Sequence, residues 1–262
     1  MDWPMWIESN TFRTRFRHLV TSGCSFTSNR TSTDNAPYAW PDMLADWCGL
    51  KIHNLAVPGA GNDHVAHSLI LYLEKANLDP AETLVLPMWT GPARIDWITD
   101  RASSKFGSQY QFDYHYDEHN ELTLGGHWWL HPRPTHLIKT LQEYSKYQST
   151  SSFALKTWLA MQSVQNYLLA KHYTFYFTSF FSPNSLSLID KPINIVEELE
   201  RIKLSLDMNH WLPMANEDYY GNWCNRMNMV DTDGYHPANN ANLEWPQQVL
   251  VPCLKQLGII NE

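Results

Sequence analysis

Three side chains of this sequence have the types and the order of an activated nucleophile. Ser25 follows an apolar run at 17–22, and Asp233 and His236 stand three residues apart near the C-terminus. A serine hydroxyl is a poor nucleophile until a base takes its proton, and a carboxylate can orient a histidine for that task. The combination predicts hydrolysis or transfer of an acyl group, with Ser25 as nucleophile, His236 as base and Asp233 as the orienting acid.

The elements that must position these residues alternate in the first third of the chain. We expect an α/β fold, because a β-α-β-α-β order is typical of a parallel sheet covered by helices. The expected strands are 17–22, 51–57 and 83–89, and the expected helices are 37–48, which ends before Gly49, and 62–76, which begins with the capping residues Asn62 and Asp63.

Ligands bind beyond the carboxyl ends of the strands in an open parallel sheet. Three loops should therefore meet at the site: 23–30, 58–63 and 89–94. The first carries Ser25, and the glycines of the second, Gly59 and Gly61, let the backbone approach a ligand closely.

The remainder of the chain is less regular. We interpret 99–135 as an inserted cap or hairpin within a single domain that spans 1–262. The pattern then predicts helices at 136–147, 151–171 and 193–206, a buried strand at 173–178, an irregular stretch at 207–230, and a closing helix at 239–257 that Pro246 and Pro252 bend or break.

The sequence blocks resemble those of the SGNH (GDSL-like) hydrolase family. Gly23-Cys24-Ser25 corresponds to the Gly-Asp-Ser block, with Cys24 in place of the aspartate, and Asn54 precedes Gly59 by the family's spacing, with Gly61 as a near alternative. Asp233 and His236 match the C-terminal Asp-x-x-His block, whereas 89–92 lacks the asparagine of the third block. The resemblance implies a three-layer α/β/α sandwich of flavodoxin-like type, ester substrates and no cofactor.

The tetrahedral oxyanion of acyl transfer needs preset hydrogen-bond donors. The backbone N–H groups of Ser25 and Gly59 are the expected donors. Because the third-block asparagine is absent, the Thr90 hydroxyl, the Gly91 N–H and the Asn62 side chain are the candidates for a further donor.

Other residues have two interpretations. Cys24 is either a thiol nucleophile or a buried packing residue, since neighbours on an extended segment point opposite ways. Arg94 either binds an anionic substrate group, shapes the third loop or forms a salt bridge with Asp96 or another carboxylate. If 113–119 is a strand, one of its faces carries four residues of metal-ligand type: Asp113, His115, Asp117 and His119. The alternative is a solvated hairpin face, and we expect no metal there. The aromatic candidates for substrate contact are Trp89, Trp128 and Trp129.

Composition limits the class of protein. A net charge of −8 without Lys/Arg clusters argues against a nucleic-acid partner. No apolar run reaches the roughly 20 residues of a membrane span, and the N-terminus lacks a signal-peptide pattern. With scattered cysteines, these features indicate a cytoplasmic protein, and they leave open one that is carried on a virion or exported by another route.

We therefore predict a serine esterase. The 12 tryptophans are explained by a large core or by a cleft for a carbohydrate O-acetyl ester or small aryl ester. An O-acyltransferase on the same triad and a non-catalytic binding module that retains the fold are the alternatives. The sequence makes no prediction of the oligomeric state.

Overall fold

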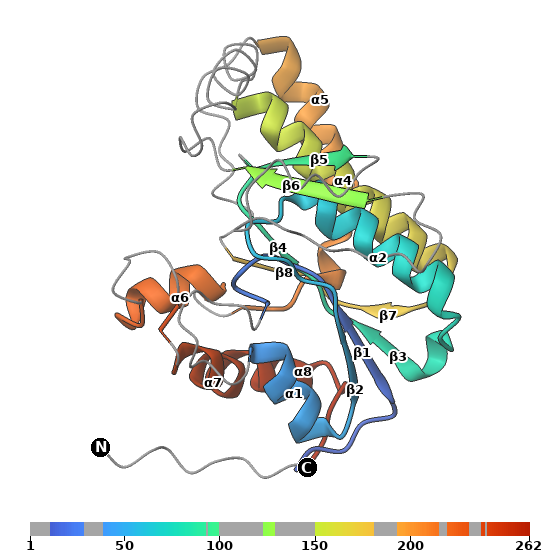
Figure 1. Cartoon of the computed structure of the whole chain (residues 1–262), viewed down its shortest axis with the longest axis vertical. Helices are drawn as coiled ribbons and strands as arrows, with labels where there is room; N and C mark the ends of the chain where they lie inside the picture. Colours follow the sequence, from blue (N-terminus) through green and yellow to red (C-terminus); the bar gives the residue numbers. More distant parts are fainter. Residues whose placement is uncertain are drawn as a thin grey trace.

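The protein folds around one parallel sheet, seen in the computed structural model of Figure 1. The structure describes residues 11–28, 39–92, 94–99, 123–128, 150–180, 193–214, 219–230, 237–238 and 240–262. The strands are β1 (His18–Thr21), β2 (Lys51–Asn54), β3 (Thr83–Val85), β4 (Met88–Trp89), β5 (Ile95–Thr99), β6 (Thr123–Trp128), β7 (Thr174–Phe175) and β8 (Thr178–Ser179). The α-helices are α1 (Trp40–Cys48), α2 (Asn62–Ala76), α4 (Thr150–Ala170), α5 (Ile193–Leu204), α6 (Tyr220–Arg226), α7 (Ala241–Trp245) and α8 (Val251–Gln256).

The strand order of the sheet is β2-β1-β3-β7, with every pair parallel. The pair β4–β8 continues β3–β7 in the same parallel sense, and the Thr178 N–H donates to the Pro87 carbonyl between them at 3.1 Å. Phe177 forms a further parallel bridge with Trp211 on the far side. This order corresponds to the flavodoxin-like type, in which β2 is added on one side of β1 and the later strands, starting with β3, are added on its other side.

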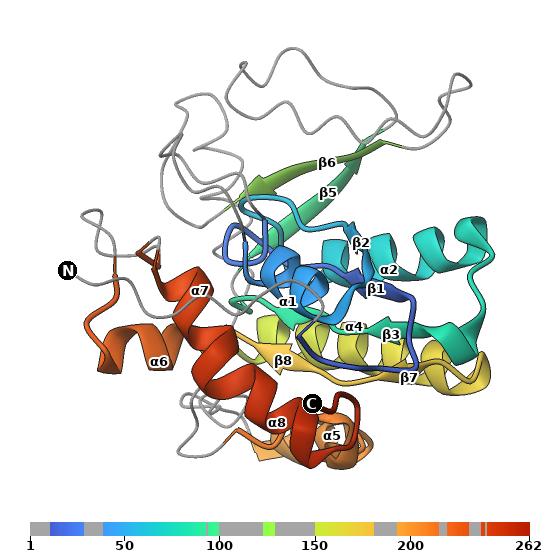
Figure 2. The same cartoon turned by 90° about the horizontal axis from the view of Figure 1, so that it is seen from below.

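Successive strand residues face opposite layers of helices. Leu19 and Leu84 belong to the hydrophobic cluster shared with α1, α6, α7 and α8, whereas Val20 and Val85 belong to the cluster shared with α2 and α4. Figures 1 and 2 show these two groups of helices on opposite faces of the sheet. The predicted three-layer α/β/α sandwich is confirmed.

The third strand continues past a proline. The N–H groups of Leu86 and Met88 donate to Val20 and Ser22 of the β1 segment, both at 2.9 Å. The intervening Pro87 has no N–H, but its carbonyl serves the neighbouring strand. The expected strand 83–89 is therefore present as β3 and β4.

One prediction in the C-terminal part was wrong in detail. The stretch 207–230 is not wholly irregular, because it contains α6 and a 3₁₀ turn at Met208–His210. The closing helix is interrupted at its first proline, as expected: α7 ends at Trp245, a π-helical turn spans Pro246–Leu250, and α8 follows. A wider turn with i→i+5 bonding accommodates a residue without an N–H.

Part of the expected insertion is described. Strand β6 pairs antiparallel with β5, and this pair lies beside the first turn of α2 (Figure 1). The rest of 99–135 and the helix predicted at 136–147 lie outside the described residues, so the single domain with a cap stays a prediction. Among the helices that the structure describes, none is both long and apolar enough to cross a membrane.

Candidate active site at the carboxyl edge of the sheet

The loop after β1 is a tight turn that begins at Cys24. The Cys24 carbonyl accepts hydrogen bonds from the N–H groups of Thr27 and Ser28, both at 2.9 Å. A methyl group on Gly23 would lie 2.7 Å from the Thr27 Cβ, so the turn closes only with glycine at that position. Ser25 is 8% exposed, whereas Cys24 is 0% exposed and packs in the core. The packing interpretation of Cys24 therefore holds over the thiol nucleophile.

The loop after β2 is tied to the Ser25 turn. The Asn54 amide donates to the Thr27 carbonyl at 2.8 Å, and the Val57 N–H donates to the Gly23 carbonyl at 3.1 Å. Gly59 has a φ of 83°, a conformation that suits glycine. Within the described part of the chain, its N–H has no hydrogen-bond acceptor. This N–H is therefore a candidate oxyanion donor.

Asn62 joins the second loop to the third. Its Oδ1 accepts from the Thr90 N–H at 2.8 Å, and its Nδ2 donates to the Thr90 carbonyl and to Thr157 Oγ1 of α4, both at 3.1 Å. Both amide hydrogens are thus engaged, and the Thr90 hydroxyl donates to the Ala60 carbonyl at 3.1 Å. These bonds oppose the oxyanion roles predicted for the Asn62 and Thr90 side chains, which instead hold the second and third loops together.

Gly91 is the remaining candidate in the third loop. It is half-buried, and a methyl group at this position would meet no atom of the described residues within 4 Å. Among the described residues its N–H also has no acceptor. The Gly91 N–H therefore remains a candidate oxyanion donor.

Two predicted substrate contacts are internal. Trp89 is 0% exposed and packs edge to face on Phe177, with ring centroids 5.3 Å apart. Arg94 is 8% exposed, and its Nη1 donates to the Ala60 carbonyl at 2.8 Å. The burial of Trp89 argues against a substrate contact, and Arg94 shapes the second loop.

The sequence suggested Asp96 only as a partner of Arg94 and did not predict its contacts with the second loop and α2. Its Oδ1 accepts from the Gly61 N–H and its Oδ2 from the His64 N–H, both at 2.8 Å. It thereby caps α2, whose own N-cap residue, Gly61, has no side chain to do so. A glycine before a helix that should start at Asn62 was the only signal that a distant carboxylate was needed.

The start of α2 is electrostatically crowded. Burial raises the pKa of Asp63, and the nearby negative charge of Asp96 raises it further, while His67 and Lys156 act in the opposite direction. Two carboxylates thus share the helix N-terminus, where backbone N–H groups and the helix dipole favour negative charge.

Asp233 and His236 lie outside the described residues, but their flanks are described. Val230 and Pro237 form an antiparallel bridge, so the two ends of the segment between them meet. The preceding helix, α6, packs on the Ser25 turn: the ring centroids of Phe26 and Tyr220 are 6.4 Å apart. The segment that carries the predicted acid and base therefore follows a helix in contact with the Ser25 turn.

The remaining predicted positions are described only in part. Trp128 ends β6, whose backbone alone is described, and Trp129 lies outside the described residues. The four ligand-type residues at 113–119 lie outside as well. Among the described residues there is no group of three or more His, Cys, Asp or Glu side chains that could hold a metal ion.

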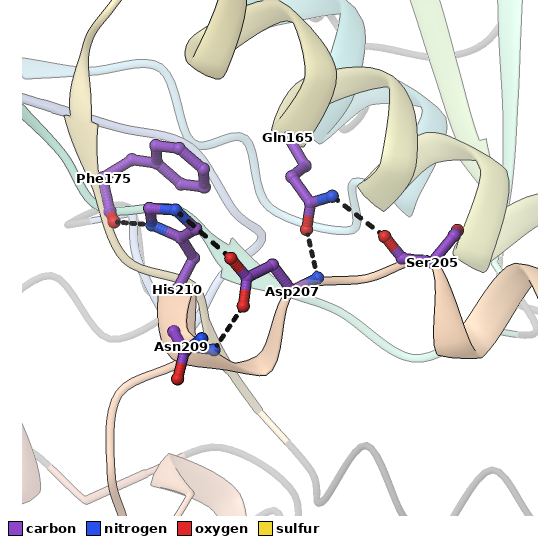
Figure 3. Close-up of polar contacts among 6 residues, drawn as sticks. All are labelled: Gln165, Phe175, Ser205, Asp207, Asn209 and His210. Atoms are coloured by element: carbon purple, nitrogen blue, oxygen red, sulfur yellow. Dashed lines mark hydrogen bonds and ion pairs between the residues drawn. The ribbon is translucent and has the colours of Figure 1, made fainter.

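A second serine, aspartate and histidine group lies near the end of α5 (Figure 3). His210 Nε2 is 3.9 Å from Asp207 Oδ2, which is too long for a hydrogen bond, and its Nδ1 faces the Phe175 carbonyl. Ser205 Oγ donates to the Ile202 carbonyl at 2.5 Å. Since the serine and the histidine do not face each other, this group is not a triad.

The buried Gln165 holds the backbone of two residues drawn in Figure 3 in place. Its side chain holds the Asp207 N–H at 2.7 Å and the Ser205 carbonyl at 3.1 Å, so it fixes the turn that leads to the bridge at Trp211. A nearby hollow of about 430 Å³, lined by Arg15, Tyr176 and His210 among others, adjoins the start of β7. It is therefore separate from the carboxyl edge where Ser25 lies.

The tryptophans belong mostly to the core. All seven whose burial is described are buried: Trp40, Trp47, Trp89, Trp158, Trp211, Trp223 and Trp245. The core explanation for the aromatic content is thus sufficient for this part of the chain, and the aromatic content gives no support to a sugar-lined cleft there.

No family model matches the chain, and no curated protein matches it. Among solved structures, the chain is similar to TesA (12% identity, 92% of this chain and 99% of that chain covered, TM-score 0.49). It is also similar to the psychrotrophic esterase EstA from Pseudoalteromonas sp. (11%, 92% and 98%, 0.47) and to a lipolytic G-D-S-L protein from Veillonella parvula (9%, 92% and 97%, 0.46). Because the TM-scores are below 0.5, the fold assignment rests on the chain's own strand order and register.

Proposed function

We propose that this protein is a serine ester hydrolase of the SGNH type that acts through an acyl-enzyme on Ser25. The observation that carries the proposal is the convergence, at the carboxyl edge of one parallel sheet, of the three loops that contain Ser25, Gly59 and Gly91. Hydrogen bonds between the loops support this convergence: Asn54 and Val57 join the first loop to the second, and Asn62 joins the second to the third.

The proposed reaction has two halves. Ser25 Oγ attacks the ester carbonyl carbon while His236 takes its proton, and Asp233 stabilises the imidazolium. The tetrahedral intermediate expels the alcohol, which receives the proton from His236. Water then attacks the acyl-enzyme with His236 as base, the acid leaves, and Ser25 Oγ regains a proton. This chemistry requires no metal or cofactor.

The oxyanion would be held by three backbone donors. We assign them to the N–H groups of Ser25, Gly59 and Gly91, because the amide hydrogens of Asn62 and the hydroxyl of Thr90 have internal acceptors. Loss of one donor costs about 3–4 kcal/mol in the transition state. A backbone donor in place of the missing third-block asparagine would preserve that contribution.

The substrate class that we propose is an ester with a small acyl group. The described tryptophans are in the core, so the prediction of an acetylated-carbohydrate substrate rests on no described contact. Acetylated sugars are one class of ester to be assayed beside simple aryl acetates.

Labelling with a fluorophosphonate, together with turnover of p-nitrophenyl acetate, tests the function. The wild-type protein should be labelled and active, and Ser25→Ala should be neither. Ser28→Ala is a matched control, because Ser28 is a buried serine of the same turn. Labelling of Ser25 with transfer to an added alcohol but no hydrolysis would indicate an acyltransferase. A folded wild-type protein that is neither labelled nor active would refute the hydrolase and leave a binding module.

A further inference from the structure

The loop that carries Gly59 is held by two charged residues of opposite sign. Arg94 Nη1 donates to the Ala60 carbonyl at 2.8 Å, and Asp96 Oδ1 accepts from the Gly61 N–H at 2.8 Å. The Ala60 carbonyl and the Gly61 N–H belong to the same peptide unit, the one that joins Ala60 to Gly61. Both sides of this planar unit are therefore fixed, by side chains from a segment more than thirty positions further along the chain.

Further bonds extend the restraint to the neighbouring units. The Ala60 N–H donates to the Val57 carbonyl at 3.0 Å, which fixes the peptide unit between Gly59 and Ala60. Asp96 Oδ2 also accepts from the His64 N–H, which anchors the first turn of α2. The Gly59 N–H belongs to the next unit upstream, whose freedom is reduced to rotation about Gly59 φ and about ψ of Pro58, since the proline ring fixes the preceding φ.

Gly61 is required for space rather than for backbone freedom. Its φ is −95°, which any residue can adopt. A methyl group there would lie 2.6 Å from Asp96 Oδ2 and 3.1 Å from the Arg94 Cβ. The two charged residues thus approach the loop so closely that only glycine leaves room for them.

The chemistry of the contacts makes this restraint stiff. Hydrogen bonds in which one partner is charged are shorter and stronger than neutral ones. Arg94 is buried, so water does not compete freely for its contact with Ala60. In addition, the Asp96 carboxylate sits at a helix N-terminus, where negative charge is favoured.

We propose that Arg94 and Asp96 are positioning residues, which clamp the Ala60–Gly61 peptide unit so that the Gly59 N–H points at the developing oxyanion. The catalytic consequence rests on the proposed esterase function, whereas the ordering of the loop does not. Neither residue touches the reacting atoms in this scheme. Their contribution should therefore appear in kcat rather than in KM.

The test compares kcat, KM and loop order in Arg94→Leu, Arg94→Lys, Asp96→Ala and Asp96→Asn. Misplacing a catalytic donor by about 1 Å costs on the order of 100-fold in rate, so we expect Arg94→Leu and Asp96→Ala to lose about 10–100-fold in kcat with KM within about threefold. Arg94→Lys and Asp96→Asn, which retain one hydrogen-bonding atom each, should recover part of this loss. They also serve if the larger changes prevent folding.

Asp79→Ala is the matched control. Asp79 accepts from the Ala81 N–H at 2.9 Å and caps the short 3₁₀ helix before β3, so its loss removes a carboxylate cap away from the site. It should lower stability without changing kcat. Gly61→Ala, in contrast, should displace Asp96 and reproduce the kinetics of Asp96→Ala.

Amide hydrogen exchange separates failure of the clamp from failure of the esterase. Asp96→Ala should speed exchange across 57–64, while Asp79→Ala should not. Unchanged kcat in folded Arg94→Leu and Asp96→Ala, beside an inactive Ser25→Ala, would overturn the clamp and leave the esterase intact. If the wild-type protein lacks esterase activity, the proposed function fails. In that case unchanged exchange across 57–64 in folded Asp96→Ala would overturn the clamp as well.

Discussion

Replacing Asn62 with alanine should be among the most costly single changes at the carboxyl edge. The buried side chain makes three hydrogen bonds, two with the backbone of Thr90 and one with Thr157. Each bond contributes about 1 kcal/mol net, and a buried N–H or carbonyl left without its partner costs about 1–3 kcal/mol. Two unpartnered Thr90 groups at about 1–3 kcal/mol each, plus the lost Thr157 bond at about 1 kcal/mol, predict a loss of about 3–7 kcal/mol, a large share of the roughly 5–15 kcal/mol by which a domain is stable.

Urea unfolding followed by tryptophan fluorescence measures this loss. Thr157→Val should cost about 1 kcal/mol alone and almost nothing more in Asn62→Ala, because the bond it removes is then already absent. Asn240→Ala is the control, since among the described residues its exposed amide has one hydrogen bond, to Glu244 at 3.3 Å, and it should change stability by less than about 0.5 kcal/mol. If Asn62→Ala behaved like Asn240→Ala, Asn62 would not join the loops as described.

Three further changes test other parts of the structure. Trp89→Phe should destabilise the core by about 1–2 kcal/mol and leave KM unchanged; a raised KM would restore Trp89 as a substrate contact. Burial raises the pKa of Cys48 and of Cys224 to about 12, so neither thiol should be alkylated at about pH 8 until the protein is unfolded. Peptide mapping that found either thiol modified in the native protein would contradict their burial. Burial, together with the charges of His18 and Lys51, lowers the pKa of His53 below its ordinary 6.5. The stability linked to neutral His53 is therefore complete above pH 6.5, and it is lost as the pH falls through the lowered pKa. Between pH 7 and about pH 5 the melting temperature should therefore fall more in the wild-type protein than in His53→Gln, with the exposed His172→Asn as control, and equal slopes would contradict this.

Local patterns were sufficient for the elements that depend on their own sequence. The helix predicted at 62–76 is α2 with the same ends, because its apolar spacing lies within the segment, although the expected capping by Asn62 and Asp63 was wrong: the N-cap residue is Gly61. The strand expected at 17–22 is β1, whose alternating residues reach opposite layers. Such elements follow from periodicity.

Features that depend on distant partners could not be predicted. Nothing near Gly61 indicates that Asp96 caps α2, and nothing near Asn62 indicates that Thr90 and Thr157 use up its amide hydrogens. The short helix α6 was missed because its seven residues hold only about two turns of pattern within an irregular stretch. Pro246 does interrupt the closing α-helix, as expected, but the π turn that follows could not be predicted from the sequence.

Trapping the acyl-enzyme tests the central claim most directly. The wild-type protein mixed with p-nitrophenyl acetate should release a burst of p-nitrophenol of one equivalent per chain. Acid quenching during the burst, followed by peptide mass spectrometry, should then find the acetyl group on Ser25, and His236→Ala should lose the burst. An acetyl group on another residue, or a burst that persists in Ser25→Ala, would contradict the account.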